Sequence, residues 1–296
     1  MTTAIFKYID TSALAKDEKP WVKVDADVAS FKLAEHKRSV RDLRGRETEF
    51  TTDNSGFAVY TEPTRETTFR DDAAIRSAYY QEIKDLLKKR IPGIKKVHIF
   101  DHTIRRRDPE AARTPIQQVH VDQTPGAAEA RVRRHLPADE AEELLQGRFQ
   151  IINVWRPIEN PASDFPLAVI DWRTTKPDDF VPVNLLYPKR EGADNDDRGK
   201  EVRPDESKLY STEGYEVKGG TMSVAPSEAH KFYYQKDMTP DEVILLKCYD
   251  SWGEGQPNGK KGIAVRTPHT AFIDPQTPEG APGRQSIEVR CLVFYE

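Results

Sequence analysis

Hydrophobic residues fall into many short runs after residue 90, and polar or turn-forming residues separate the runs. Each run is rich in β-branched and aromatic residues and is bounded by Pro, Gly or Asp, a pattern typical of β-strands. Many short strands with few helices predict a mainly β fold with flanking helices, a sandwich or barrel rather than a parallel α/β sheet. The runs are "KKVHIFDHTI", "IQQVHVDQT", "RFQIINVWRPI", "PLAVIDWRT", "TMSVAP", "KFYYQ", "EVILLKCYDSW", "GIAVRT" and "SIEVRCLVFYE".

Two segments have helical spacing instead. Apolar residues recur every three or four positions between residues 72 and 90, acidic residues precede them, and "KKR" followed by "IPG" ends the pattern. This is the pattern of an amphipathic helix with charges that suit its dipole. Residues 137–146 predict a shorter helix, with acidic residues early and Gly147 directly after it.

No internal repeat and no Gly/Ser-rich linker divides the chain, so we expect a single domain over residues 1–296. Residues 1–56 are charged and predict an irregular N-terminal extension on the main body. Residues 189–208, "KREGADNDDRGKEVRPDESK", carry charges of both signs without apolar periodicity. They are interpreted as a charged surface loop or as a lid beside a pocket.

Composition and charge exclude several functions. The formal net charge is -4 at pH 7, which argues against nucleic-acid binding. No apolar run reaches 18 residues and the first residues lack a signal-peptide core, so we expect no membrane association and a cytoplasmic location. The two cysteines, Cys248 and Cys291, lie in separate apolar runs, which excludes a CxxC zinc site and favours buried thiols.

The run "QQVHVDQT" carries a candidate metal-binding pair. Alternate residues of a strand share a face, so His120 and Asp122 would project together while Val119 and Val121 pack on the other side. An imidazole and a carboxylate so placed can bind one metal ion, with a third ligand from elsewhere in the chain. Two His and one carboxylate are the facial triad of non-haem Fe(II) oxygenases.

The third ligand is expected among the other histidines. His269, in "RTPHTAF", is favoured over His230 because Arg284 and Ser286 follow it in an Arg-x-Ser arrangement. A guanidinium and a hydroxyl are what the distal carboxylate of 2-oxoglutarate requires. His230 stays open as an alternative. His102, which precedes the pair, is expected to be structural or to support the site from behind its ligands.

Several long segments resemble the fungal and bacterial hydroxylase/desaturase family of secondary metabolism, which includes gibberellin-desaturase-like enzymes. The resemblance covers residues 57–295 and is carried by "FDHTIRRR", "PIQQVHVDQT", "NVWRPIENPASDFPLAVIDWRT", "YYQKDMTPDEVILLKCYDS" and "RTPHTAFIDP". It implies a double-stranded β-helix (jelly-roll) oxygenase that uses Fe(II), 2-oxoglutarate and O2. On the matching positions, His120, Asp122 and His269 would hold iron. Arg284 and Ser286 would hold 2-oxoglutarate, with Arg290 as the alternative to Arg284.

Further residues are candidates for substrate binding. In "NVWRPI", alternation places Asn153 and Trp155 on one face and Arg156 on the other, and either face could meet a carboxylate. Alternation in "TIRRRD" sends Arg106 opposite to its two neighbours, and Tyr187 directly precedes the charged segment. An inward arginine would favour an anionic substrate.

The predicted function is hydroxylation, desaturation or oxidative cyclisation of a small molecule that carries a carboxylate. Two alternatives remain open: a cupin-like metalloenzyme that does not use 2-oxoglutarate, with His230 in its metal shell, and a non-catalytic small-molecule-binding protein on the same scaffold. We expect a small-molecule substrate and allow for a homo-oligomer.

Overall fold

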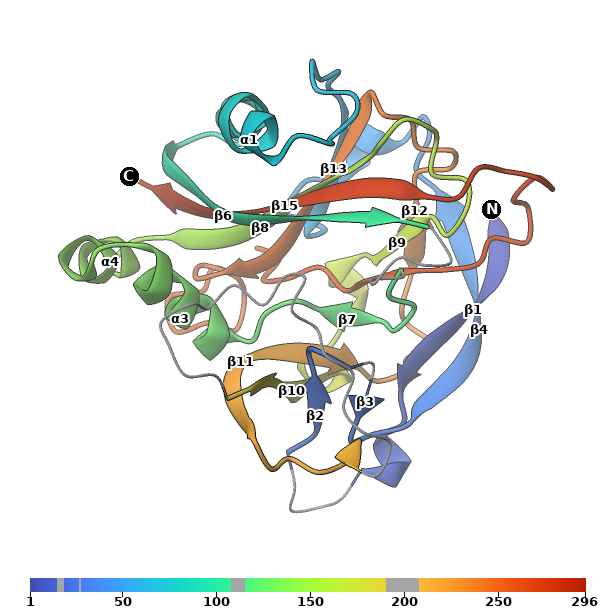
Figure 1. Ribbon diagram of the computed structural model, residues 1–296, viewed down its shortest axis with the longest axis horizontal. Coiled ribbons are helices and arrows are strands. Elements are labelled where there is room, and N and C mark those ends of the chain that lie inside the picture. The colour runs from blue at the N-terminus through green and yellow to red at the C-terminus, as the bar shows by residue number, and fades with distance from the viewer. Residues whose placement is uncertain (15–18, 27, 108–114, 190–207) are drawn as a thin grey trace.

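Two β-sheets form the body of the protein (Figure 1). A computed structural model describes residues 1–14, 19–26, 28–107, 115–189 and 208–296. Within these ranges the smaller sheet has five strands, in the order β5-β13-β8-β15-β6, and all neighbours are antiparallel. Its strands are β5 (Phe57–Thr61), β13 (Glu242–Asp250), β8 (Phe149–Pro157), β15 (Gln285–Tyr295) and β6 (Ile94–Arg106).

The larger sheet has ten strands in the described part of the chain and curls on itself. The order is β1-β4-β12-β9-β14-β7-β11-β10-β2-β3. An isolated bridge between Lys7 and Gln118 joins β1, at one edge of the sheet, to the segment just before β7. There the Val119 N–H donates to the Lys7 carbonyl over 2.9 Å. The strands are β1 (Thr2–Ile9), β2 (Trp21–Lys23), β3 (Val28–Ala29), β4 (Leu33–Asp42), β7 (His120–Val121), β9 (Leu167–Ile170), β10 (Phe180–Pro188), β11 (Tyr215–Val224), β12 (Phe232–Tyr234) and β14 (His269–Ala271).

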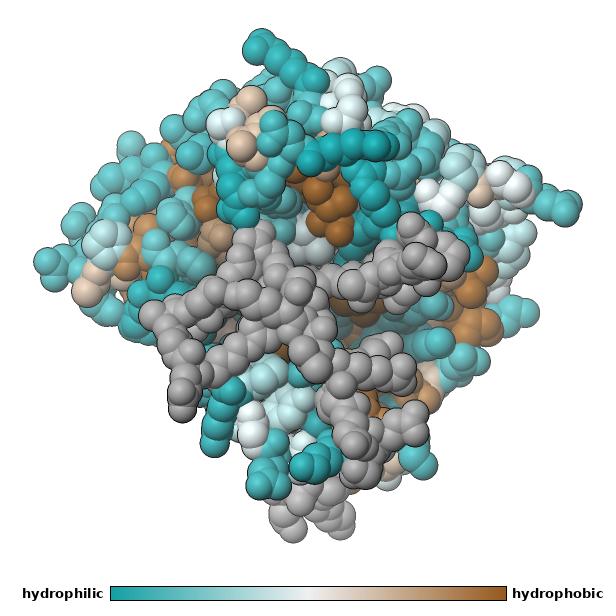
Figure 2. Space-filling view, viewed as in Figure 1, coloured by the Kyte–Doolittle hydropathy of each residue, from teal (hydrophilic) through white to brown (hydrophobic). Residues whose placement is uncertain are grey.

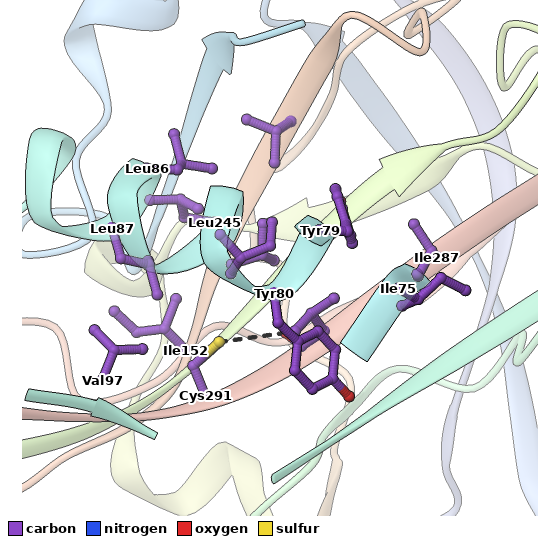
Figure 3. Close-up of a cluster of buried hydrophobic side chains, with 14 of the residues drawn as sticks. Ile75, Tyr79, Tyr80, Leu86, Leu87, Val97, Ile152, Leu245, Ile287 and Cys291 are labelled. Carbon is purple, nitrogen blue, oxygen red and sulfur yellow. Dashed lines mark hydrogen bonds between the residues drawn. The ribbon is translucent and has the colours of Figure 1, made fainter. Parts of the chain in front are cut away.

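Alternation along β8 and β15 separates an inner from an outer face of the five-stranded sheet. Ile152 and Val154 of β8 pack outward with Ile287 of β15, under a helical segment. Figure 3 shows this outer layer, with Tyr79 and Leu87 of the helical segment above the strands. Inner-face residues such as Trp155 and Leu246 pack instead against Val169 and Tyr233 of the larger sheet, so the two sheets enclose a second core.

The helical segment on the outer face runs continuously from residue 72 to residue 90, as predicted. It comprises α1 (Asp72–Ala74), a π turn (Ile75–Tyr79) and α2 (Tyr80–Arg90). The Asp71 carboxylate caps its start by accepting from the Ala73 N–H over 2.9 Å. The predicted second helix is α4 (Ala138–Leu145).

A third helix, α3 (Pro125–His135), is absent from the sequence prediction. It begins three residues after Asp122, with the Thr124 hydroxyl accepting from the Ala127 N–H over 3.2 Å and Pro125 in its first turn. Ala128 and Val132 pack it onto inner-face residues of β8, β13 and β15. The helix therefore covers one end of the space between the sheets.

Two other predictions about local structure are wrong. Residues 1–56 are not an irregular extension, because β1 and β4 pair over eight residues each and belong to the larger sheet. Alternate residues of β1 are buried, which makes it a regular sheet strand. The run "GIAVRT" has no strand of its own, and the strand begins at His269 instead.

The view in Figure 2 is predominantly hydrophilic, as a chain with 32% charged residues requires. Among the helices that the structure describes, none is both long and apolar enough to cross a membrane.

Candidate metal centre

Three side chains that the sequence singled out come together on the larger sheet. His120 begins β7, Asp122 follows it, and His269 begins β14 directly opposite His120 in antiparallel register. One potential ligand atom from each lies within 4.8 Å of the others. Asp122 Oδ1 is 3.3 Å from His120 Nε2 and 3.7 Å from His269 Nε2. The two rings are 4.5 Å apart between centroids.

Both histidines are oriented in the same way by their own backbone. His120 Nδ1 is 2.8 Å from the Gln118 carbonyl, and His269 Nδ1 is 3.0 Å from the Thr267 carbonyl. A carbonyl can only accept, so each Nδ1–H is the donor and each Nε2 is left to face Asp122. Such outer hydrogen bonds fix the tautomer of a metal-binding histidine.

The carboxylate of Asp122 is held from behind by residues of the other sheet. Asn153 Nδ2 donates to Asp122 Oδ2 over 2.6 Å, and the Cys248 thiol lies 4.0 Å from the same oxygen. Oδ1 is thereby turned toward the two histidines. Asn153 was predicted to contact a substrate; the structure places its amide on Asp122 instead, so it orients a candidate ligand.

Replacing Asn153 with Leu should weaken iron binding by about 10- to 100-fold, because Asp122 would lose the donor that fixes its orientation. The measurement is an anaerobic Fe(II) titration. Asn160→Leu is the matched control, since Asn160 donates to the Pro161 carbonyl at the surface. Equal iron affinity in both variants would show that the Asn153 hydrogen bond does not position the carboxylate.

The ionised carboxylate of Asp122 and the neutral ring of His269 suit a divalent cation. Burial raises the pKa of Asp122, but its hydrogen bond with His120 and its electrostatic interaction with both histidines lower it more, so the carboxylate is ionised at neutral pH. Burial, together with the nearby His120, lowers the pKa of His269 to about 4. Burial also lowers the pKa of His120, but the hydrogen bond and charge of Asp122 outweigh it and the net pKa is raised. Two imidazoles and one carboxylate fit one transition-metal ion and leave positions open for other ligands.

Arg284 is a buried arginine on the inner face of the smaller sheet, and no carboxylate among the described residues forms an ion pair with it. Arg284 is 4% exposed and donates from Nη1 to the Phe165 carbonyl over 2.7 Å, while its Nε has no acceptor among the described residues. Its guanidinium lies 5.6 Å from the centroid of the Trp155 ring. Burial and the positive charge of Arg105 lower the pKa of Arg284 to about 9. A buried guanidinium with a free donor is suited to the carboxylate of a bound small acid.

Arg290, the alternative to Arg284, already has acidic partners. Its Nε is 3.2 Å from Asp101 Oδ1 and 3.5 Å from Glu288 Oε1, and its Nη2 donates to the Thr103 hydroxyl over 2.6 Å. Ser286 is 2% exposed, two residues along from Arg284. Because Arg290 already contacts two acidic residues, the Arg284–Ser286 pair is favoured over Arg290 as the site for a small acid.

Two arginines among the substrate-binding candidates lie away from the metal cluster. Arg156 is on the outer face of β8, where it donates to the Tyr79 hydroxyl over 3.2 Å and to the Pro240 carbonyl over 2.7 Å. Arg106 donates to the Gln285 side chain and to the Thr68 carbonyl. Its neighbour Arg105 stands opposite Ser286 in register and therefore shares the inner face.

The other residues predicted for the site lie in different parts of the fold. Trp155 is buried on the inner face, and Tyr187, on β10, is close enough to Arg290 to interact with it electrostatically.

His230 lies away from the metal cluster, between Asp179 Oδ2 at 2.9 Å and the Tyr8 hydroxyl at 3.2 Å. His102 bonds to the Tyr80 hydroxyl at 2.8 Å, on the helix-covered face. Neither histidine joins the metal cluster, and most of the charged segment 189–208 lies outside the described residues.

Sequence reasoning missed several charged residues around this site. Asp101 and Glu288 face it from β6 and β15, and Arg131 approaches from α3. Glu288 had a signal in the sequence, because it lies two residues from both Ser286 and Arg290 and must share their face in a strand. Arg131 had none, because α3 itself was not predicted.

Comparison with known proteins agrees with this geometry. The family model described as Oxidoreductase/YMDC permease-like domain matches residues 6–294. The hydroxylase/desaturase efuI of Hormonema carpetanum is 34% identical over 275 residues, which cover 87% of this chain and 83% of that protein. The Fe(II)/2-oxoglutarate-dependent dioxygenase nvfI of Aspergillus novofumigatus is 32% identical over 273 residues, covering 90% and 86%.

A solved structure extends the likeness to the whole fold. The iron and alpha-ketoglutarate-dependent endoperoxidase NvfI superposes with a TM-score of 0.77 at 28% identity, covering 99% of this chain and 97% of the other. The curled sheets and the cluster of His120, Asp122 and His269 thus define a jelly-roll oxygenase of the non-haem Fe(II)/2-oxoglutarate-dependent class. This chain belongs to the hydroxylase/desaturase family of those enzymes.

Proposed function

We propose that His120, Asp122 and His269 hold Fe(II), and that Arg284 and Ser286 hold 2-oxoglutarate beside it. The convergence of the three ligand atoms within 4.8 Å carries this proposal. Arg284 supports the second part, because it is buried and, within the described residues, has no ion-paired acid and an unused donor at Nε. The enzyme is a dioxygenase that uses Fe(II), 2-oxoglutarate and O2.

The residues have separate roles in this proposal. His120 and His269 present Nε2 to the metal, and Asp122 presents Oδ1 while Asn153 holds its other oxygen. Bound Fe(II) supplies the activation of O2 that couples oxidative decarboxylation of 2-oxoglutarate to the removal of hydrogen from a C–H bond. The protein decides which C–H bond lies nearest.

The substrate is a small molecule of secondary metabolism, and we propose that it carries a carboxylate. Hydroxylation, desaturation and oxidative cyclisation all remain candidate outcomes. Residues 1–296 are proposed to act as one oxygenase domain without nucleic-acid or membrane partners, as a monomer or homo-oligomer. Cys248 and Cys291 are both free and buried, in keeping with a cytoplasmic location.

Succinate release tests the proposal. Purified enzyme supplied with Fe(II), O2 and 2-oxoglutarate should release succinate and CO2 in equal amounts, and omission of either Fe(II) or 2-oxoglutarate should stop it. The measurement is succinate by chromatography together with CO2 from labelled 2-oxoglutarate. Substrate oxidation that continues without 2-oxoglutarate would favour the cupin-like alternative. A wild-type protein that binds no Fe(II) would favour the non-catalytic one.

A further inference from the structure

Arg131 places a positive charge at the end of the space between the sheets that α3 covers. It lies one turn after Ala127 and Ala128, which are both buried, so it projects from the packed side of the helix. Its guanidinium lies 5.2 Å from the centroid of the Phe100 ring of β6, and that ring packs with inner-face residues of the smaller sheet. In Figure 1, α3 leads directly from β7 and lies beside β11.

A short series of neighbours links Arg131 to the metal cluster. Asn153, which is bonded to the cluster's carboxylate, stands opposite Arg290 in the β8–β15 register. Arg290 in turn stands opposite Asp101 in the β15–β6 register. Asp101 directly follows Phe100, the ring on which Arg131 rests. The cation therefore lies on the metal's side of the smaller sheet.

Arg131 has no ion-paired counterion within the described residues, although the charge of Asp101 also acts on it. No hydrogen bond or ion pair joins its guanidinium to any residue in the part of the chain that the structure describes. The two acids on this face, Asp101 and Glu288, both contact Arg290, at 3.2 and 3.5 Å. Burial and the charge of Arg290 lower the pKa of Arg131, and Tyr187 is close enough to interact electrostatically with both arginines. A partly buried cation beside a second cation is stabilised by an anionic ligand.

We propose that Arg131 binds the carboxylate of the oxygenase's substrate. This inference rests on the proposed function, in which Arg284 binds the carboxylate of 2-oxoglutarate, and it adds a second and separate anion site. The charge at α3 would hold one end of the substrate and so determine which of its C–H bonds faces the metal.

A binding experiment separates this inference from the proposed function. Anaerobic enzyme with Fe(II) and 2-oxoglutarate is followed by its visible charge-transfer band while benzoic, 1-naphthylacetic and abietic acids, and the methyl ester of each, are added. Wild type should bind at least one acid about tenfold more tightly than its ester, because only the acid forms a charge-assisted bond with Arg131. Arg131→Met should bind acid and ester equally. Arg134→Met, on the exposed face of the same helix, should behave as wild type.

The outcomes are distinct. Absence of the charge-transfer band in wild type would overturn the proposed function itself. A normal band with no acid preferred in wild type, or with a preference that survives in Arg131→Met, would overturn only the inference about Arg131.

Thermal unfolding gives a second readout that requires no ligand. If Arg131 serves a ligand, Arg131→Met should unfold at the same temperature as Arg134→Met or about 2 °C higher, because an unpaired, partly buried charge is removed. A midpoint several degrees lower in Arg131→Met would mean that the arginine stabilises the fold, and it would count against the proposal.

Discussion

His269→Ala is expected to lose both Fe(II) binding and 2-oxoglutarate decarboxylation. His269 is 4% exposed and stands directly opposite His120, so no other described histidine can take its place without moving a strand. The remaining pair would leave the metal with only two protein ligands. We expect the iron affinity to fall by more than about 100-fold, the upper end of what removal of a merely orienting group costs. Anaerobic Fe(II) titration and succinate release measure the two effects.

His230→Gln is the matched control for this variant. His230 is also buried, but it lies between Asp179 and the Tyr8 hydroxyl rather than beside Asp122. Its replacement should cost some thermal stability and leave iron affinity unchanged. If His230→Gln lost iron and His269→Ala kept it, the assignment of the third ligand would be wrong and the cupin-like alternative would regain its main support.

The sequence was sufficient for the strands whose apolar runs are long and buried on both faces. β8 and β13 are buried along their whole length, and both were predicted. β4 was missed because its exposed side carries charged residues at alternate positions, which resembles an irregular charged segment. α3 was missed because small residues, chiefly Ala127 and Ala128, form its buried side and give little hydrophobic signal.

For the candidate metal centre, the sequence likewise shows local patterns within a strand but not contacts between the two sheets. His120 and Asp122 could be predicted to share a face because alternation is a local property of strands. The amide of Asn153 could not be assigned to Asp122, since that contact depends on how the two sheets pack. Alternation also showed that Arg105 and Arg106 point in opposite directions, but only the β6–β15 register shows that Arg105 is the inward one.

Arg284 and Arg290 could not be separated from the sequence, and their surroundings now distinguish them. Both lie on the inner face, Arg284 buried and Arg290 partly buried, but Arg290 contacts Asp101 and Glu288, whereas Arg284 has one backbone carbonyl and a ring as partners. An arginine that is already neutralised gains little from a further carboxylate. The carboxylate of a bound small acid would therefore neutralise Arg284 rather than Arg290.

Arg284→Met should raise the KM for 2-oxoglutarate by about 100-fold, because a buried charge-assisted pair is worth ~2.7 kcal/mol or more. Iron affinity should stay within about twofold of wild type, since Arg284 contacts none of the three candidate ligands. Without 2-oxoglutarate the variant should unfold at the wild-type temperature or slightly above it, because a guanidinium with an unsatisfied Nε is removed. Succinate release at increasing 2-oxoglutarate concentrations and thermal unfolding provide these measurements.

Arg290→Met is the comparison variant for Arg284→Met. It leaves Asp101 and Glu288 without the cation that they contact, so it should lower the unfolding temperature by several degrees, as expected when one partner of a partly buried ion pair is removed. The KM for 2-oxoglutarate in the folded enzyme should change far less than in Arg284→Met. If the two variants exchanged these effects, with a raised KM in Arg290→Met and lost stability in Arg284→Met, 2-oxoglutarate would have to be assigned to Arg290.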